Sequence, residues 1–384
     1  GLVALVGVGA MALLTFTHKP QSNDPGENSV QPSVSSSQGE FASASNRPFR
    51  ISIGDTIEEG ALGKGAGALD HAREQDTYTF TAHPGQRVYF RVLSHDPALA
   101  LAEWKLIDRD EQEVFRTCLG CGQPGVQQLR AGGTYKLQVG GTQDAMGSYR
   151  LRLHEVPDPD RFSIQIGDSI GEDKPGRGAG TIESPGVEDV YSFQASSRQR
   201  VYFRIHGFSA GVAQARMRLL DADEAEVFNG CLGCSEPGLQ SLTKGGSYTL
   251  TIGNRTDPGT GTYRLQLFDV PSPDAFSISI PAKIAAGIPG PRAAQIESPG
   301  AEDRYELALE TGQKLEFKLI EYDRSLTYNR WRFVDETETE LFNVCLGCSA
   351  PPVQTISRRG RYVLIVGSPT NASTGAYAIS VEPR

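Results

Sequence analysis

The sequence lacks the features by which several functional classes are recognised. No cluster of Lys and Arg accompanies exposed aromatic residues, and the formal net charge is −9 over 384 residues, so the electrostatic pattern of a nucleic-acid-binding protein is missing. The six His residues form no HExxH motif and share no position in the internal repeat, which leaves no zinc-protease motif and no His-based triad. We therefore expect no nucleic-acid partner, no enzyme activity, no cofactor and no metal site.

Helical periodicity is also missing after Ser22. No stretch of 12 residues beyond it places apolar side chains at helical spacing, whereas Gly (43 residues) and Pro (23 residues) are frequent. Because Gly and Pro mark turns, the chain is expected to consist of many short strands. An apolar content of 38% with 22% charged residues indicates folded domains, and the length suggests about two to four of them.

The first 17 residues are apolar or small and carry no charge, and the run ends at His18 and Lys19. A helix of this length reaches roughly 25 Å, slightly less than the roughly 30 Å hydrocarbon core of a bilayer. We predict an apolar helix at residues 1–17 that acts as a membrane anchor, with a cleaved signal peptide or a buried helix as alternatives. Residues 18–47, rich in Ser and Pro, are expected to form a disordered linker.

This anchor predicts a single-pass protein of the cell membrane. Residues 18–384 would then lie outside the cytoplasm, either in the periplasm or at the cell surface. The protein would then contact the membrane through residues 1–17 alone.

A segment of about 110 residues occurs three times in the chain. An Asp-x-Tyr motif begins at Asp76 and recurs 113 residues later at Asp189 and a further 114 residues later at Asp303. Pro-containing linkers separate the copies. We predict three domains, which we call repeats 1, 2 and 3, at residues 48–157, 158–271 and 272–384.

Within each repeat the apolar residues alternate with polar ones, as in half-buried strands. Val88, Phe90 and Val92 are predicted to face a core. Residues 135–139 and 149–153 show the same period around a Gly-containing turn, which we interpret as a β-hairpin. Strands this short, with turns about every 8 to 12 residues, predict an all-β chain of three tandem antiparallel, jelly-roll-like β-sandwich domains.

The sequence Cys-Leu-Gly-Cys occurs once in each repeat and nowhere else. One such pair supplies only two of the four ligands of a structural zinc site, and Pro124 follows the first pair where a redox-active CxxC would begin a helix. We predict a local disulfide that stiffens one loop, with shared zinc, redox-active pairs or free thiols as alternatives. The residues concerned are Cys118, Cys121, Cys231, Cys234, Cys345 and Cys348. A stiffened loop at the same place in three repeats is a candidate contact surface.

Two further patterns are interpreted as structural. Carboxylates cluster at residues 108–113 and again at 221–226, where we expect a hydrated hairpin turn, with calcium binding as the alternative. Trp104 and Trp331 occupy one repeat position, which is Met217 in repeat 2. This favours a core position over a sugar-stacking platform.

Several short motifs of repeat 2 resemble the bacterial pre-peptidase C-terminal (PPC) domain family. They are Ile-Gly-Asp-Ser-Ile at 166–170, Ile-Glu-Ser-Pro-Gly at 182–186, Asp-Val-Tyr-Ser-Phe at 189–193, and Gly-x-Tyr-x-Leu at 246–250 and 261–265. The resemblance extends over all three repeats. It implies non-catalytic β-sandwich modules of the kind attached to secreted peptidases and surface proteins, some of which bind collagen or calcium. Such motifs specify a fold better than an activity.

Together these observations predict a non-catalytic, membrane-tethered, extracytoplasmic protein that acts as a binding or spacer module. Its partner would be an extracellular protein or polysaccharide, bound through repeated loops. The alternative is the extracytoplasmic sensor part of a single-pass receptor, for example a Ser/Thr kinase whose cytoplasmic domain precedes Gly1.

Overall fold

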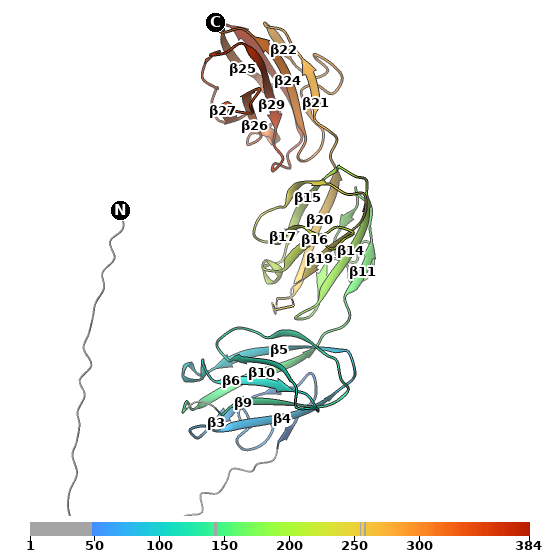
Figure 1. The fold of residues 1–384 in the computed structure, drawn as a ribbon, viewed down its shortest axis with the longest axis vertical. Helices are drawn as coiled ribbons and strands as arrows, with labels where there is room; N and C mark the ends of the chain where they lie inside the picture. Colours follow the sequence, from blue (N-terminus) through green and yellow to red (C-terminus); the bar gives the residue numbers. More distant parts are fainter. Residues whose placement is uncertain (1–47, 142–143, 254, 257–258) are drawn as a thin grey trace, which may run out of the picture. The chain divides into compact units, whose positions relative to one another are not determined.

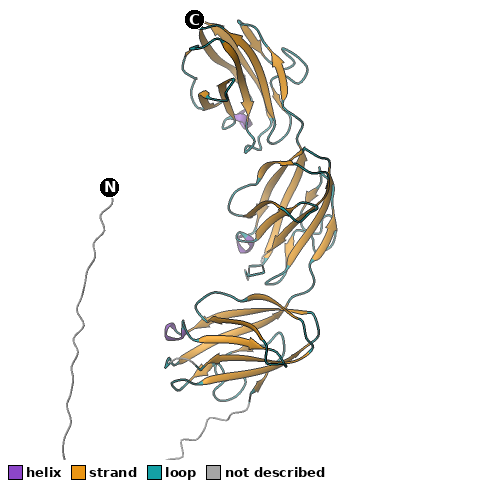
Figure 2. Cartoon of the chain, in the orientation of Figure 1, coloured by secondary structure: helices purple, strands orange, loops and turns teal. Residues whose placement is uncertain are grey.

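The computed structural model describes residues 48–141, 144–253, 255–256 and 259–384. The predicted apolar helix and linker at residues 1–47 lie outside this part. In the described residues the regular elements are β-strands and the short 3-10 helices η1 (Pro97–Leu99), η2 (Ala210–Val212) and η3 (Arg324–Leu326) (Figure 2). None of the helices in the described ranges is long and apolar enough to cross a membrane.

Repeat 1 folds into two facing sheets (Figure 1). The first sheet has the strand order β1 (Phe49–Arg50), β4 (Gln75–Ala82), β9 (Gly133–Gly140), β6 (Glu103–Ile107), β7 (Glu113–Cys118). The second sheet has the order β2 (Thr56–Ile57), β10 (Gly147–Glu155), β5 (Gln86–His95), β8 (Gly125–Leu129), and β3 (Ala68–Leu69) also pairs with β10. Strands β1 and β4 are parallel, and the other pairs of this repeat are antiparallel.

Repeats 2 and 3 have the same topology. The sheets of repeat 2 contain β11 (Asp160–Ser163), β14 (Glu188–Ala195), β19 (Gly246–Gly253), β16 (Arg216–Leu220), β17 (Glu226–Cys231), and then β12 (Ser169–Ile170), β20 (Gly261–Asp269), β15 (Gln199–Phe208), β18 (Gly238–Leu242) and β13 (Thr181–Ile182). Those of repeat 3 contain β21 (Asp274–Ser277), β24 (Glu302–Leu309), β29 (Gly360–Gly367), β26 (Arg330–Asp335), β27 (Glu340–Cys345), and then β22 (Ala282–Ile284), β30 (Gly375–Pro383), β25 (Lys314–Tyr322), β28 (Gln354–Thr355) and β23 (Gln295–Ile296). The part of the chain that the structure describes is therefore all-β, with three tandem β-sandwich units.

The core of each unit lies between its two sheets, as the alternating pattern predicts. In repeat 1, β5 of the second sheet contributes the buried side chains of Val88 and Phe90 to this core, and β9 of the first sheet contributes Leu137. Trp104 and its repeat equivalents are also buried, so their predicted core position is confirmed. Burying a side chain such as Val88, Phe90 or Leu137 stabilises the fold by about 1.5–3 kcal/mol relative to leaving it exposed.

The hairpin predicted from residues 135–139 and 149–153 is wrong. Strand β9 pairs with β4 and β6, whereas β10 pairs with β5 in the opposite sheet. Both strands alternate because both present one face to the same core. A period of two reveals a buried face but not the sheet to which the strand belongs. The predicted turn between Leu106 and Phe115 does join paired strands, β6 and β7.

Tyr89 points away from the core of repeat 1 and is nevertheless fully buried. It packs beside Val187 of repeat 2 in one apolar cluster, and its hydroxyl donates to the carbonyl oxygen of Thr256 at 2.8 Å. The amide of Val126 donates to the carbonyl oxygen of Arg255 at 2.7 Å. The loop of repeat 2 that carries Arg255 is therefore anchored by two hydrogen bonds from repeat 1.

Candidate functional site

A disulfide closes the Cys-Leu-Gly-Cys loop of every repeat. Bonds join Cys118 to Cys121, Cys231 to Cys234 and Cys345 to Cys348, with Cα atoms 5.0, 5.2 and 5.3 Å apart. Each loop begins at the last residue of β7, β17 or β27, and in each an amide of the second Cys donates to the carbonyl of the first. The six predicted site residues thus form three separate loops at equivalent positions of the repeats, and the chain has no free cysteine.

Each loop is held against the short 3-10 helix of its own repeat. In repeat 1 the amides of Leu119 and Gly120 donate to the carbonyls of Ala102 (3.0 Å) and Ala100 (2.7 Å), and Leu119 is buried. A Cβ on Gly120 would lie 2.9 Å from the Ala100 carbonyl oxygen, so the close approach requires glycine. A Cβ on Gly233 would likewise lie 2.9 Å from the Ala213 carbonyl oxygen, and one on Gly347 would lie 2.6 Å from the Thr327 side chain and 2.7 Å from the Tyr322 hydroxyl. The Leu-Gly between the cysteines is therefore explained by packing.

The residue after each 3-10 turn points into solvent beside the loop. Leu101 is 66% exposed and Tyr328 is 77% exposed, and the equivalent residue of repeat 2 is the exposed Gln214. In repeat 3 a pocket of about 620 Å³ lies beside the loop and is lined in part by Tyr322 and Cys348. The three repeats thus present different side chains on the same rigid support.

Each core contains a buried carboxylate shared by two tyrosines. The hydroxyl of Tyr78 donates to Asp76 at 3.1 Å, the hydroxyl of Tyr149 also donates to Asp76, and the two hydroxyl oxygens lie 2.8 Å apart. The same network joins Asp189, Tyr191 and Tyr263 in repeat 2 and Asp303, Tyr305 and Tyr377 in repeat 3. In the sequence these residues stand out only as parts of recurring short motifs. The recurring Asp-x-Tyr and Gly-x-Tyr motifs were the available signal.

Burial dominates the electrostatics of this network. It raises the pKa of Asp76 to about 6 and the pKa values of Asp189 and Asp303 to about 7, although the tyrosine hydroxyls act in the opposite direction. The first tyrosine of each network lies in one sheet and the second in the facing sheet. The carboxylates therefore hold the two sheets together, and their raised pKa values have a structural cause.

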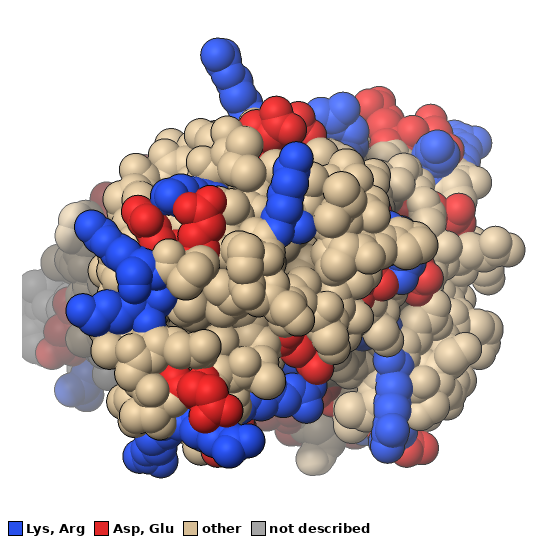
Figure 3. Space-filling view, turned by 90° about the horizontal axis from the view of Figure 1, so that it is seen from above, with Lys and Arg blue, Asp and Glu red and all other residues tan. Residues whose placement is uncertain are grey.

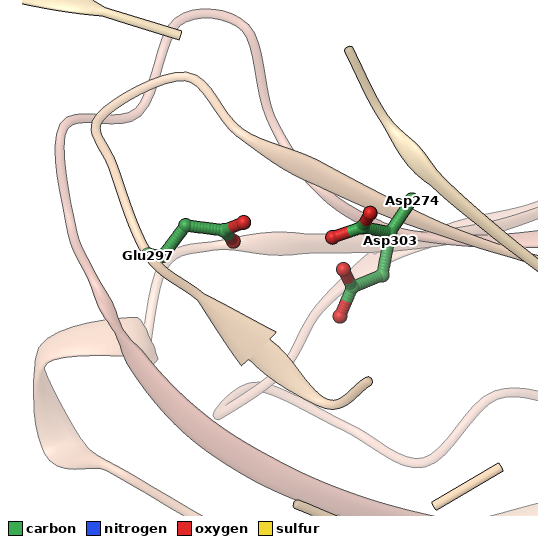
Figure 4. Close-up of side chains that lie close together, drawn as sticks. All are labelled: Asp274, Glu297 and Asp303. Carbon is green, nitrogen blue, oxygen red and sulfur yellow. The ribbon is translucent and has the colours of Figure 1, made fainter. Parts of the chain in front are cut away.

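Repeat 3 brings three carboxylates together at the edge of its sandwich. Oxygen atoms of Asp274, Glu297 and Asp303 lie within 4.8 Å of one another, and the two aspartates come from adjacent strands (Figure 4). Arg292 forms ion pairs with Asp274 and with Glu297, the latter at 3.7 Å. The guanidinium therefore already supplies positive charge to this cluster. In repeat 2 the position of Arg292 is held by Gly178.

The carboxylates predicted in a hairpin turn serve the turn itself. Asp108 Oδ1 accepts hydrogen bonds from the amides of Asp110 (2.9 Å) and Gln112 (2.8 Å). Asp221 accepts two equivalent bonds in repeat 2. These oxygens satisfy backbone donors that the turn would otherwise leave to water.

Comparisons with known proteins identify no family for this chain. No protein-family model matches the sequence, and no curated protein matches it. Solved structures that resemble it include the CUB1-EGF-CUB2 domain of human MASP-1/3, at 12% identity, covering 57% of this chain and 100% of that one, with a TM-score of 0.21. The full extracellular region of zebrafish Gpr126/Adgrg6 shows 9% identity, 88% and 57% coverage, and a TM-score of 0.19.

A third structure, a triple jelly roll from the turret of an archaeal virus, shows 9% identity, 85% and 88% coverage, and a TM-score of 0.18. All three TM-scores lie far below 0.5, so these likenesses carry no argument about this chain. The resemblance to PPC domains stays a prediction.

Proposed function

We propose that this chain is a non-catalytic binding module held outside the cytoplasm, built from three PPC-like sandwiches and tethered to the cell membrane through residues 1–17. Its partner is an extracellular protein or polysaccharide, and the disulfide loops with their neighbouring 3-10 helices are the contact surface. The observation that carries this proposal is the threefold occurrence of one loop on a rigid scaffold, with a different exposed side chain each time: Leu101, Gln214 and Tyr328.

The chemistry of the buried groups supports a binding role over catalysis. In the described residues the carboxylates with raised pKa values of about 6 and about 7 are buried between the sheets and hydrogen-bonded to tyrosines. A general acid or base has to reach its substrate within hydrogen-bonding distance. Groups enclosed in this way stabilise the fold.

Multiplicity suits a repeating partner. Linking several weak sites in one chain raises the overall affinity because later contacts form within the same complex, and the gain is on the order of 100-fold or more where the geometry permits simultaneous contact. A polymer with a repeated motif would use this advantage most fully.

A binding screen of the oxidised chain against extracellular proteins and polysaccharides tests the proposal. We expect a partner whose binding is weakened by the double variant Leu101→Ser, Tyr328→Ser and by reduction of the disulfides. The matched control is Ile320→Ser, which removes an exposed apolar side chain, 54% exposed, that belongs to β25 and not to a disulfide loop or a 3-10 helix. No partner in the screen, or binding that ignores the double variant, would contradict the proposal.

A further inference from the structure

The outer face of the β14–β19–β16 sheet in repeat 2 contains a pocket of about 350 Å³ that is rich in arginine. Its lining consists of Glu188, Arg216, Arg218, Thr251, Gly253, Arg255 and Thr256. Three guanidinium groups thus surround a hollow that contains a single carboxylate. By contrast, acidic and basic side chains are interspersed on the face of the molecule shown in Figure 3.

Strand register explains the hollow. Gly253 lies between Glu188 on β14 and Arg216 on β16, directly opposite both. It has no side chain to fill the space between them. A Cβ at this position would come within 2.4 Å of the Val187 carbonyl oxygen, and the φ angle is +136°. The backbone therefore restricts the position to glycine and keeps the pocket open.

Two of the arginines are held in place by a hydrogen bond from Nε, and their terminal N–H groups remain available to a ligand. Arg216 Nε donates to Asn229 at 2.6 Å and Arg218 Nε donates to Glu226 at 2.9 Å. In the described part of the chain, the terminal nitrogens of both groups have no hydrogen-bond partner, and neither has the guanidinium of Arg255. A guanidinium fixed through Nε and free at its two terminal nitrogens matches the forked binding of a carboxylate or sulfate.

The carboxylate in the pocket does not cancel this charge. Glu188 is opposed by Arg87 of repeat 1 at 3.9 Å. Burial raises the pKa of Glu188, while Arg255, Arg87 and Arg216 lower it, so the four groups are close enough to interact. The four guanidinium groups are those of the three lining arginines and of Arg87. They are accompanied by two carboxylates, Glu188 and Glu226, so positive charge is in excess.

The other repeats do not build this pocket. Repeat 1 has Glu103 at the position of Arg216. Repeat 3 keeps an arginine there, Arg330, but its neighbour Arg332 is paired with Glu302 at 2.6 Å and Pro369 replaces Arg255. In the described residues, repeat 2 therefore combines three arginines with a single lining carboxylate, whereas the arginines that line the pocket of about 280 Å³ in repeat 3 are accompanied by four carboxylates.

We propose that this pocket binds the carboxylate or sulfate group of an acidic polysaccharide. Thr251 lies opposite Arg218 in the strand register and lines the pocket, so its hydroxyl can bond to a sugar hydroxyl. The lining offers no aromatic or aliphatic anchor of the kind that dominates protein–protein contacts. Because the chain carries a net charge of −9, a polyanion is repelled elsewhere and its binding depends on this local charge.

This inference rests on the proposed binding function and names the ligand class for one repeat. Arg216 lies opposite Cys231 in the strand register, so the disulfide loop of repeat 2 begins beside the pocket. The acidic polysaccharide would thus approach the same end of the sheet as the proposed contact loop.

Titration of the full chain with three saccharides tests it. The ligands are an oligogalacturonate, which carries carboxylates, a heparin oligosaccharide, which also carries sulfates, and the methyl-esterified oligogalacturonate, which has no charge. We expect at least one charged ligand to bind and the ester to fail. Arg216→Ala and Arg255→Ala should each weaken binding roughly tenfold or more, and raising the salt from about 50 to about 200 mM should weaken it further.

Arg330→Ala is the matched control, because Arg330 makes the same contact to an asparagine in repeat 3, Nε to Asn343 Oδ1 at 2.7 Å. It should leave binding unchanged. Arg255→Ala remains informative if Arg216→Ala unfolds, since the Arg255 side chain has no hydrogen bond to lose in the described residues. Equal binding of the ester, or equal loss in Arg330→Ala, would overturn the inference.

The two proposals fail differently. A chain that binds another partner through its loops but neither acidic saccharide contradicts only the arginine pocket. A chain that binds nothing in the screen contradicts the binding function itself.

Discussion

The hydroxyl oxygens of Tyr191 and Tyr263 lie 2.8 Å apart, and both hydroxyls donate to the same buried oxygen of Asp189. Tyr191 belongs to β14 and Tyr263 to β20, which lie in facing sheets. The other oxygen of Asp189 is buried without a hydrogen-bond partner. An ionised carboxylate in such surroundings is costly, and a proton relieves the cost.

The stability of the chain should therefore respond to the titration of Asp189. Its pKa is about 7 in the folded state against an ordinary 3.8, so the folded state holds a proton that the unfolded state has released. The resulting stabilisation is complete below about pH 4 and is lost as the pH rises to about 7. The free energy of unfolding, measured by denaturant titration at several pH values, should carry this contribution.

The variant Asp189→Asn isolates that contribution from other titrating groups. Asp221 and Asp335 have lowered pKa values because of hydrogen bonds to Lys244 and Thr337. The contribution of these two groups to folding stability therefore increases as the pH rises, opposite to that of Asp189. Relative to Asp189→Asn, the original chain should therefore lose stability between about pH 4 and about pH 7. Parallel stability curves for the two proteins would show that Asp189 does not titrate as expected.

Tyr263→Phe should destabilise repeat 2 by about 1–3 kcal/mol, because it removes one of the two hydroxyls that bond to the buried carboxylate. The loss should be larger near pH 8 than near pH 5, since ionised Asp189 depends more on its donors. Denaturant unfolding at both pH values measures it. The control is Tyr248→Phe, whose hydroxyl donates to a backbone carbonyl, that of Lys244. An equal loss in both variants would argue against a special role for the carboxylate.

The β-sandwich fold can be predicted from the sequence because the spacing of apolar residues follows directly from which side chains are buried. Alternation of the kind seen at Val88, Phe90 and Val92 directly reports a strand with one buried face. The threefold recurrence of Asp-x-Tyr then fixes the number of units. What periodicity cannot report is strand pairing: residues 135–139 and 149–153 alternate alike but belong to opposite sheets. Pairing depends on contacts between distant residues.

The two candidate sites also differ in whether the sequence predicts them, because one is local in the chain and the other is formed by distant residues. The disulfide loops are visible in the sequence because both cysteines lie within four residues. The arginine pocket is not visible, because Arg216 and Arg255 are far apart in the chain and become neighbours only through the register of β16 and β19. Tyr89 likewise alternates as an exposed residue and is buried only by the next repeat.

Replacing Trp331 separates volume from chemistry in the core of repeat 3. Trp331→Ala should cost about 3–5 kcal/mol through the cavity it leaves. Trp331→Met should cost less, because Met217 fills the equivalent place in repeat 2 and because the Nε1 donor of Trp331, buried without a partner, is removed. Denaturant unfolding of both variants checks the order. Equal losses would show that repeat 3 cannot adjust to a methionine at this position.

The redox chemistry of the loops can be tested by counting thiols. In the oxidised chain no cysteine should react with a thiol reagent, and reduction should release six thiols without denaturant, because the second cysteine of each pair is solvent-exposed. The double variant Cys231→Ser, Cys234→Ser should lose about 2 kcal/mol at most, since closing so small a loop removes little entropy from the unfolded chain. Its strands should persist, because Leu232 and Gly233 retain their bonds to Ala215 and Ala213. Thiols that react before reduction, or zinc bound in proportion to the protein, would contradict the disulfide assignment.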